Sequence, residues 1–328
     1  MSIEKQSIND RYAIYCGDCI EVTPQLKENS VHLSVYSPPF CGLYNYSSSE
    51  HDMSNCKNAD EFFQHYEFLV KQIHRITMPG RLSAVHCSDI PKKGGGIMDL
   101  PGEIIRLHEA NGFEYHARYA IWKEPLRVAI RTRSKGLTHR QIVKDSTFSN
   151  NAGADYMVVF KKKGENKIPV SHPGGLVGYA GEREIPDGLE AKFADWKDPQ
   201  TNKLAHWIWQ QYASSFWDDI RIGRVLPYKH AKDKEEEKHC HPLQLDVIER
   251  CVTLWTNPGE VVFTPFMGVG SEVFGAVSLG RKAIGVELKA SYFRQAEANI
   301  KLALVETRKQ DDLFSDYVIE AEPETFEE

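Results

Sequence analysis

VVFTPFMGVGSEVFGAVSLGRKAIGVE, residues 261–287, is the stretch that decides the fold. It predicts a strand, a glycine loop, a helix over residues 268–279 and a second strand at 283–287 that ends in an acid. Gly268 and Gly270 let the backbone approach a ligand closely, and the helix that follows offers free amide groups. Glu287 is placed to accept hydrogen bonds from ribose hydroxyls. The stretch therefore predicts one half of a nucleotide-binding α/β sheet.

The N-terminal part has the same rhythm of strands and helices. Residues 12–40 predict a strand, a turn, a short helix and a strand in which Val31, Leu33 and Val35 alternate. This strand ends at SPPF, residues 37–40, where proline cannot donate to a ladder and the chain must leave the sheet. SPPF is therefore expected in a loop at the carboxyl end of a strand, where open α/β sheets bind their ligands.

Further elements extend this order on both sides. Helices are predicted at 59–77, with a stop at 78–80, and at 102–110 after a glycine-rich turn at 94–96; strands are predicted at 82–85 and 115–122. Regularity fails from about 125 to 238 and returns with a helix at 243–255, a strand at 260–263 and a helix at 292–304. We expect an α/β, Rossmann-like fold, mostly a parallel sheet with helices on both faces and an irregular inserted region.

Bulk composition is that of an ordinary globular protein. Of 328 residues, 41% are hydrophobic and 26% charged, without an apolar stretch near the ~20 residues of a membrane span or the apolar core of a signal peptide. A cytoplasmic protein without membrane contact is expected. The seven scattered cysteines are expected to be free and mostly buried.

Charge is distributed unevenly. The net charge of −6 argues mildly against nucleic acid as a partner, but residues 123–167 carry eleven Lys or Arg against four acids. This stretch is either a polyanion-binding surface or a solvated charged face. Its candidate DNA contacts are Lys123, Arg127, Arg131, Arg133, Lys135 and Arg140.

The loop at 37–40 has a specific chemical use. The exocyclic amine of cytosine or adenine is a poor nucleophile, because its lone pair is delocalised into the ring. Hydrogen bonds from that amine to the Ser37 side chain and the Pro38 carbonyl would favour a tetrahedral nitrogen whose lone pair points at a methylsulfonium. Pro39 keeps the loop stiff, and Phe40 would stack on a base flipped out of the helix. As four isolated residues, SPPF would more often be a proline-rich turn.

The chain as a whole resembles the β-group amino-methyltransferases of DNA, the N4-cytosine and N6-adenine enzymes. The resemblance rests on SPPF, on HPLQ at 241–244, on PFMGVG at 265–270 and on GVELKASYFRQA at 285–296, in that order, and covers residues 12–124 and 238–304. It implies a circularly permuted fold that uses S-adenosylmethionine, which lacks a pyrophosphate and needs no third phosphate-binding glycine. The implied division is a catalytic half at 1–124, a target recognition region at 125–238, a cofactor half at 239–308 and an acidic tail at 309–328.

Site residues follow from the resemblance position by position. The catalytic motif matches Ser37, Pro38, Pro39 and Phe40; the implied cofactor ligands are Asp18, His241, Pro242, Gln244, Thr264, Pro265, Phe266, Gly268, Gly270, Ser271 and Glu287. Two positions depart from the family. Thr264 stands where an Asp is usual, so a hydroxyl or backbone contact must replace any carboxylate there. Leu245 departs from the usual HPTQKP pattern.

The target remains open among several alternatives. Ser at the first motif position is commoner among N4-cytosine enzymes and Asp among N6-adenine enzymes, so N4 of cytosine is slightly favoured. Cytosine C5 methylation is disfavoured, because that chemistry needs a Pro-Cys motif and Cys41 follows Phe40 instead. An RNA methyltransferase and a catalytically inactive DNA-binding relative are more distant alternatives. The expected product is S-adenosylhomocysteine and the expected substrate is double-stranded DNA; a homodimer and a cognate restriction nuclease are further partners.

No metal is expected. The cluster His239, Cys240 and His241, taken with Cys16 and Cys19, lacks the spacing of a zinc site, because adjacent ligands do not converge easily on one ion. A second set of residues, Trp207, Trp209 and Trp217, could stack on bases, although core packing is the commoner use of tryptophan.

Overall fold

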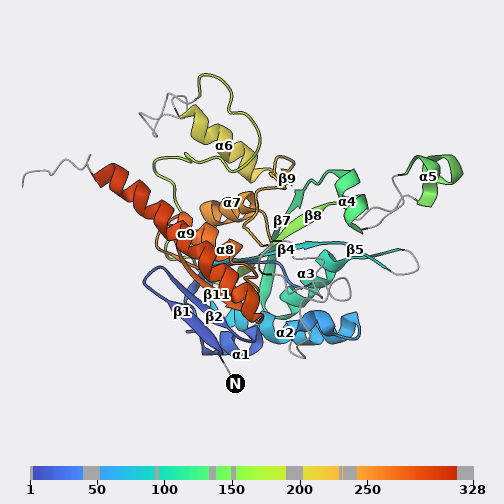
Figure 1. Ribbon diagram of the computed structural model, residues 1–328, viewed down its shortest axis with the longest axis horizontal. Coiled ribbons are helices and arrows are strands. Elements are labelled where there is room, and N and C mark those ends of the chain that lie inside the picture. Colours follow the sequence, from blue (N-terminus) through green and yellow to red (C-terminus); the bar gives the residue numbers. More distant parts are fainter. Residues whose placement is uncertain are drawn as a thin grey trace, which may run out of the picture.

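Figure 1 shows a computed structural model of the protein, which describes residues 3–39, 52–92, 96–132, 138–148, 153–189, 202–228, 231 and 242–315. In these segments nine strands form one sheet in the order β1-β2-β11-β10-β3-β4-β8-β7-β9. The five strands from β2 to β4 are parallel, whereas β1 is antiparallel to β2 and β8 to both its neighbours. The bounds are β1 Lys5–Ile8, β2 Tyr12–Cys16, β3 Val31–Tyr36, β4 Thr77–Ser88, β7 Phe113–Ile121, β8 Asp155–Lys162, β9 Phe216–Trp217, β10 Val261–Thr264 and β11 Lys282–Glu287. The α/β, mostly parallel fold is confirmed.

The helices cover both faces of this sheet. They are α1 Cys19–Val22, α2 Ala59–Ile76, α3 Leu100–Ala110, α4 Pro125–Thr132, α5 His139–Lys144, α6 Lys203–Ala213, α7 Leu245–Trp255, α8 Ser271–Ser278 and α9 Ala290–Ser315, with 3-10 turns at η1 Thr23–Gln25, η2 Met53–Asn55 and η3 Ser146–Phe148. Two short strands, β5 Ile90–Pro91 and β6 Ile97–Met98, form a separate ribbon. We call the side packed against α2 and α3 the α2 face, and the side packed against α7, α8 and α9 the α7 face.

Strand β8 shows why both faces are covered. Met157 and Val159 belong to the core of the α7 face, while Val158 and Phe160 belong to the core of the α2 face. Successive side chains of a strand point to opposite sides, so an uninterrupted apolar run fits a strand only when both sides are buried. The sequence did not predict β8, which lies inside the stretch expected to be irregular. The expectation of irregular structure at 125–238 is wrong for β8 and also for the helices α4, α5 and α6.

Two other elements differ from expectation at their ends. β4 begins at Thr77, immediately after α2, although 78–80 was predicted to separate the helix from a strand that begins at 82. The register explains this: Val31 pairs with Thr77 and Leu33 with Leu82, so the residues between bulge out of the ladder. Gly80 in this bulge has a φ of 75°. α9 continues to Ser315, past residue 309, where the acidic tail was expected to begin.

The chain reverses its direction across the sheet between β10 and β3. From β3 it proceeds to β4 on one side, and from β10 to β11 on the other. Loops that leave the carboxyl ends of two such strands diverge and open a crevice, which is where sheets of this kind bind ligands. β10 and β11 also lie between β2 and β3, so the end of the chain inserts between its first strands, as a permuted order predicts.

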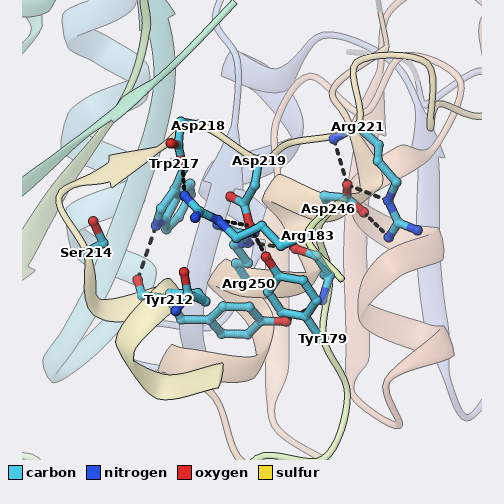
Figure 2. Close-up of polar contacts among 12 residues, drawn as sticks. Tyr179, Arg183, Tyr212, Ser214, Trp217, Asp218, Asp219, Arg221, Asp246 and Arg250 are labelled. Atoms are coloured by element: carbon cyan, nitrogen blue, oxygen red, sulfur yellow. Dashed lines mark hydrogen bonds and ion pairs between the residues drawn. The ribbon is translucent and has the colours of Figure 1, made fainter. Parts of the chain in front are cut away.

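Residues 176–189 and 202–220 attach to the α7 face through a buried cation (Figure 2). The Arg250 side chain on α7 is fully buried, and its Nη2 donates to Asp219 Oδ2 at 2.7 Å. The Tyr179 hydroxyl donates to the same carboxylate, and the rings of Tyr212 and Trp217 lie within 5.0 and 5.4 Å of the guanidinium. α6, drawn above α7 in Figure 1, forms a small core with residues 176–189. This cluster therefore fixes the α6 region to the sheet.

Candidate active site

The catalytic motif lies where the sequence places it, at the carboxyl end of β3. Ser37 is half-buried and Pro38 is buried, while Phe40 lies outside the described residues. Ser37 Oγ lies 3.1 Å from the carbonyl oxygen of His86 and 3.3 Å from His86 Nδ1, on the neighbouring strand β4. The hydroxyl is therefore held by β4 while its remaining lone pairs stay available to a substrate.

Tyr36 anchors the loop from behind. Its hydroxyl lies 2.9 Å from the Tyr66 hydroxyl and 3.3 Å from His108 Nε2, and all three side chains are buried on the α2 face. Burial lowers the pKa of His108 to about 3, so this imidazole is neutral. The Tyr36 ring also packs against Phe266, with ring centroids 6.0 Å apart. The catalytic loop and the loop after β10 are thus in contact.

The glycine loop is built around Glu287. Its carboxylate accepts the backbone N–H of Gly268 at 2.9 Å and of Lys289 at 2.8 Å. Gly268 and Gly270 both have positive φ, 52° and 90°, and a Cβ at Gly270 would lie 3.0 Å from the Ala296 Cβ. Glycine is required here by conformation and by the close approach of α9. α8 begins at the next residue, so its free amides face the same crevice.

Asp18 lies beside Glu287 at the ends of two adjacent parallel strands. The Gly17 N–H donates to the carbonyl oxygen of Glu287 at 2.9 Å, and the Asp18 carboxylate caps α1 by accepting from the Ile20 N–H at 2.9 Å. Sequence reasoning missed a further acid, Asp52, which is buried just ahead of η2. Burial raises the pKa of Glu287 to about 8, and the charge of Asp52 adds to the rise. A lone Asp in a polar loop offered no sequence signal for this contact.

Unpartnered polar atoms mark the space for a ligand. Thr264 and Ser271 are buried, yet their hydroxyls have no hydrogen-bond partner among the described residues, and neither has Oε1 of Gln244. Buried polar groups are rarely left unpaired unless a ligand or water completes them. With the glycine loop and Glu287, these atoms fit a polar nucleoside cofactor. Pro242 precedes Gln244 at the start of α7, and Pro265 follows Thr264, while His241 lies outside the described residues.

One predicted DNA contact is corrected by the structure. The Lys123 side chain is only 8% exposed and its Nζ pairs with the carboxylate of Asp155, because Ile121, two residues before Lys123, is the register partner of Asp155. Arg127 on α4 and Arg140 on α5 are exposed. The side chain of Arg131, and Arg133 and Lys135 altogether, lie outside what the structure describes. α4 starts just beyond the carboxyl end of β7, so Arg127 is on the catalytic edge of the sheet, and Figure 1 shows α5 standing well away from the sheet.

The remaining candidates have other surroundings. Trp217 is buried in the core and stacks on Tyr119, Trp207 packs on Tyr179, and Trp209 is half exposed. Within the segments described, no group of three or more metal-ligating side chains converges, and the cluster at 239–241 falls outside them. The cysteines that the structure describes are free thiols, most of them buried. In the same segments no helix is long and apolar enough to cross a membrane.

Comparison with known proteins identifies the family. The DNA methylase family model (N6_N4_Mtase) matches residues 31–298. The type II methyltransferase M.BglII of Bacillus subtilis is 23% identical over 293 residues, 89% of this chain and 68% of that protein. The DNA adenine methyltransferase YhdJ of Escherichia coli K12 is 20% identical over 302 residues, 90% of this chain and 84% of that protein.

A solved structure shares the fold. The PvuII DNA methyltransferase, described as cytosine-N4-specific, has a TM-score of 0.59 at 14% identity and covers 94% of this chain and 96% of its own. The family model spans most of the chain, including both SPP after β3 and the glycine loop after β10. The chain therefore belongs to the DNA methylase family.

Proposed function

We propose that the protein transfers a methyl group from S-adenosylmethionine to the exocyclic amine of a base flipped out of duplex DNA. The observation that carries this is the placement of two loops on either side of the reversal between β10 and β3. Ser37 and Pro38 lie on one side, and the loop tied to Glu287 lies on the other, in contact through Tyr36 and Phe266. A methyl donor in one loop and an amine in the other would meet in the crevice.

Each side of the crevice has a distinct task in this proposal. Glu287 would accept hydrogen bonds from the ribose hydroxyls of the cofactor, Asp18 would contact its adenine, and the unpartnered polar atoms of Thr264, Ser271 and Gln244 would complete its polar contacts. The cofactor, when bound, supplies an electrophilic methyl group on a sulfonium. The Ser37 hydroxyl and the Pro38 carbonyl accept hydrogen bonds from the amine, which strengthen as positive charge builds on nitrogen. Phe40 stacks on the base.

We favour N4 of cytosine as the target. The first motif position is a serine, and the adjacent hydrogen-bond partner on β4 is an imidazole and a carbonyl group, not a carboxylate. The alternative, N6 of adenine, is supported by the name of the Escherichia coli relative. The identity of the methylated base therefore needs a test separate from the test of methyl transfer itself.

Target recognition is proposed to rest on parts of 125–238 outside β8. Arg127 and Arg140 are exposed cations there, and α5 extends away from the sheet. Cations of this kind would bind phosphates and give salt-dependent affinity. We also propose that the protein forms a homodimer and acts beside a cognate restriction nuclease. Both proposals rest on the family resemblance alone.

Transfer of tritiated methyl groups tests the reaction and its substrate class together. The purified protein would be incubated with labelled S-adenosylmethionine and, separately, with duplex DNA, RNA and free nucleosides. Label in duplex DNA alone is expected. Label in RNA alone or in nucleosides alone would mean that the substrate is not duplex DNA. Label in none of them would mean that the protein is a catalytically inactive relative.

A further inference from the structure

Four polar side chains line up on one face of the sheet beside the catalytic loop. Val35 and Ala84 are partners in the β3–β4 register and both lie on the α7 face, so Ser37 and His86, two residues further along each strand, lie on that face too. Met157 places Asp155 on the same face by the same rule, and Ile121 places Lys123 there. Residues far apart in the sequence thus form one row across the carboxyl edge.

Contacts join this row from end to end. Ser37 Oγ lies 3.3 Å from His86 Nδ1, and His86 Nε2 lies 2.8 Å from Asp155 Oδ2. Lys123 Nζ pairs with the same carboxylate. His86, Asp155 and Lys123 are all less than 9% exposed.

Charge decides which nitrogen of His86 carries the proton. Burial by itself would raise the pKa of Asp155, but Lys123 and His86 outweigh burial and lower it, so the carboxylate is ionised. An anion beside Nε2 favours the tautomer with the proton on Nε2, which leaves Nδ1 as an acceptor facing Ser37. The order hydroxyl, imidazole, carboxylate is the arrangement that lets a histidine take a proton from a serine.

We propose that His86, oriented by Asp155 and Lys123, receives through the Ser37 hydroxyl the proton that the target amine loses on methylation. This rests on the proposed function. His86 is a positioning residue for Ser37, because it contacts the serine and not the base. Nothing in the SPPF motif itself provides an acceptor for that proton.

The step balances as follows. The bond between the amine nitrogen and the methyl carbon forms while the bond from that carbon to sulfur breaks, and the nitrogen becomes cationic. The serine hydroxyl, whose Oγ also lies 3.1 Å from the His86 carbonyl oxygen, turns to Nδ1. One amine N–H proton then passes to Ser37 Oγ as the serine proton passes to His86 Nδ1. The amine ends neutral, the serine is restored, and the imidazolium is stabilised by the Asp155 carboxylate. The proton later leaves His86 to solvent, so no further reactant is required.

His86→Asn separates orientation from proton transfer. The asparagine amide oxygen can take the place of Nδ1 as an acceptor for the serine hydroxyl, but it cannot be protonated near neutral pH. We expect a loss of about 10²-fold in the single-turnover rate of methyl transfer. The charged groups that face His86 are Asp155 from β8 and Lys123 from the segment after β7.

His116→Asn is the matched control, since His116 is exposed on β7 of the same sheet. It should keep the wild-type rate. Ser37→Ala and Ser37→Ala with His86→Asn should be equally slow, because the second change removes a group that acts only through the first. Binding of S-adenosylhomocysteine to each variant reports whether the fold is intact.

The outcomes separate this inference from the function beneath it. A wild-type protein that transfers no methyl group would remove the proposed function. A wild-type protein that is active, with His86→Asn equally active, would overturn the role of His86 alone. Loss of S-adenosylhomocysteine binding by His86→Asn would also overturn the role of His86, because the residue would then stabilise the fold and not accept a proton.

Discussion

Cofactor binding is predicted to depend on pH through Glu287. Burial raises the pKa of its carboxyl group to about 8, yet ribose hydroxyls are donors and bond more strongly to the ionised form, which accepts with both oxygens. With that value, about 9% of the free protein is ionised at pH 7 and about 91% at pH 9. If only this form binds, affinity scales with its population, so it should rise about tenfold between these pH values.

The ligand for this experiment is 5′-methylthioadenosine, which keeps the adenine, ribose and sulfur of the cofactor but lacks the α-amino and carboxyl groups of its methionine part, the first of which would titrate near this pH range. Isothermal titration calorimetry from pH 6 to 9 would give the affinity directly. Glu287→Gln removes the charge but keeps one carbonyl acceptor. Hydrogen bonds to a charged group are roughly twice as strong as neutral ones, so a loss of ~1–2 kcal/mol is expected at pH 9.

Glu272→Gln is the control. Glu272 on α8 is also buried, and burial raises its pKa to about 8, so it titrates in the same range. It should keep the rise of affinity with pH, whereas Glu287→Gln should abolish it. A flat wild-type profile, or a rise that survives in Glu287→Gln, would refute the assignment of the ribose contact.

Three further predictions concern other parts of the molecule. Ser37→Ala should slow methyl transfer about 10²-fold or more while S-adenosylhomocysteine affinity, measured by calorimetry, stays unchanged. Arg127→Ala combined with Arg140→Ala should weaken DNA binding and reduce the slope of log affinity against log salt by about two in gel-shift titrations; an unaltered slope would mean that these cations are only surface. Arg250→Met should lower the free energy of unfolding in urea by about 3–5 kcal/mol, because the buried Asp219 loses its cation, and a change below 1 kcal/mol would contradict that pairing.

Local pattern was enough to predict the cofactor half. The glycine spacing and the apolar runs on both sides of it depend on residues close in the sequence, so β10, α8 and β11 lie within a few residues of their predicted bounds. Strand β8 was not predicted, because it is antiparallel and no helix follows it directly to continue the alternation of strands and helices. Its position in the sheet depends on pairing with β4 and β7, which are distant in sequence.

The polar row at the catalytic edge could not be predicted for the same reason. His86 and Asp155 are joined by the register of two strands, and neither has a neighbour in sequence that signals the pairing. Lys123 was mistaken for a surface cation, because a sequence gives the charge of a lysine and not its partner. Ser37 was identified because its motif is continuous along the chain.

The most direct test of the central claim is the chemical identity of the methylated base. DNA methylated by the purified protein would be digested to nucleosides and analysed by mass spectrometry with standards for each methylated form. The site described here predicts N4-methylcytosine. N6-methyladenine would contradict the choice of base while leaving amine methylation intact, and 5-methylcytosine or an unmodified digest would contradict the catalytic role of Ser37.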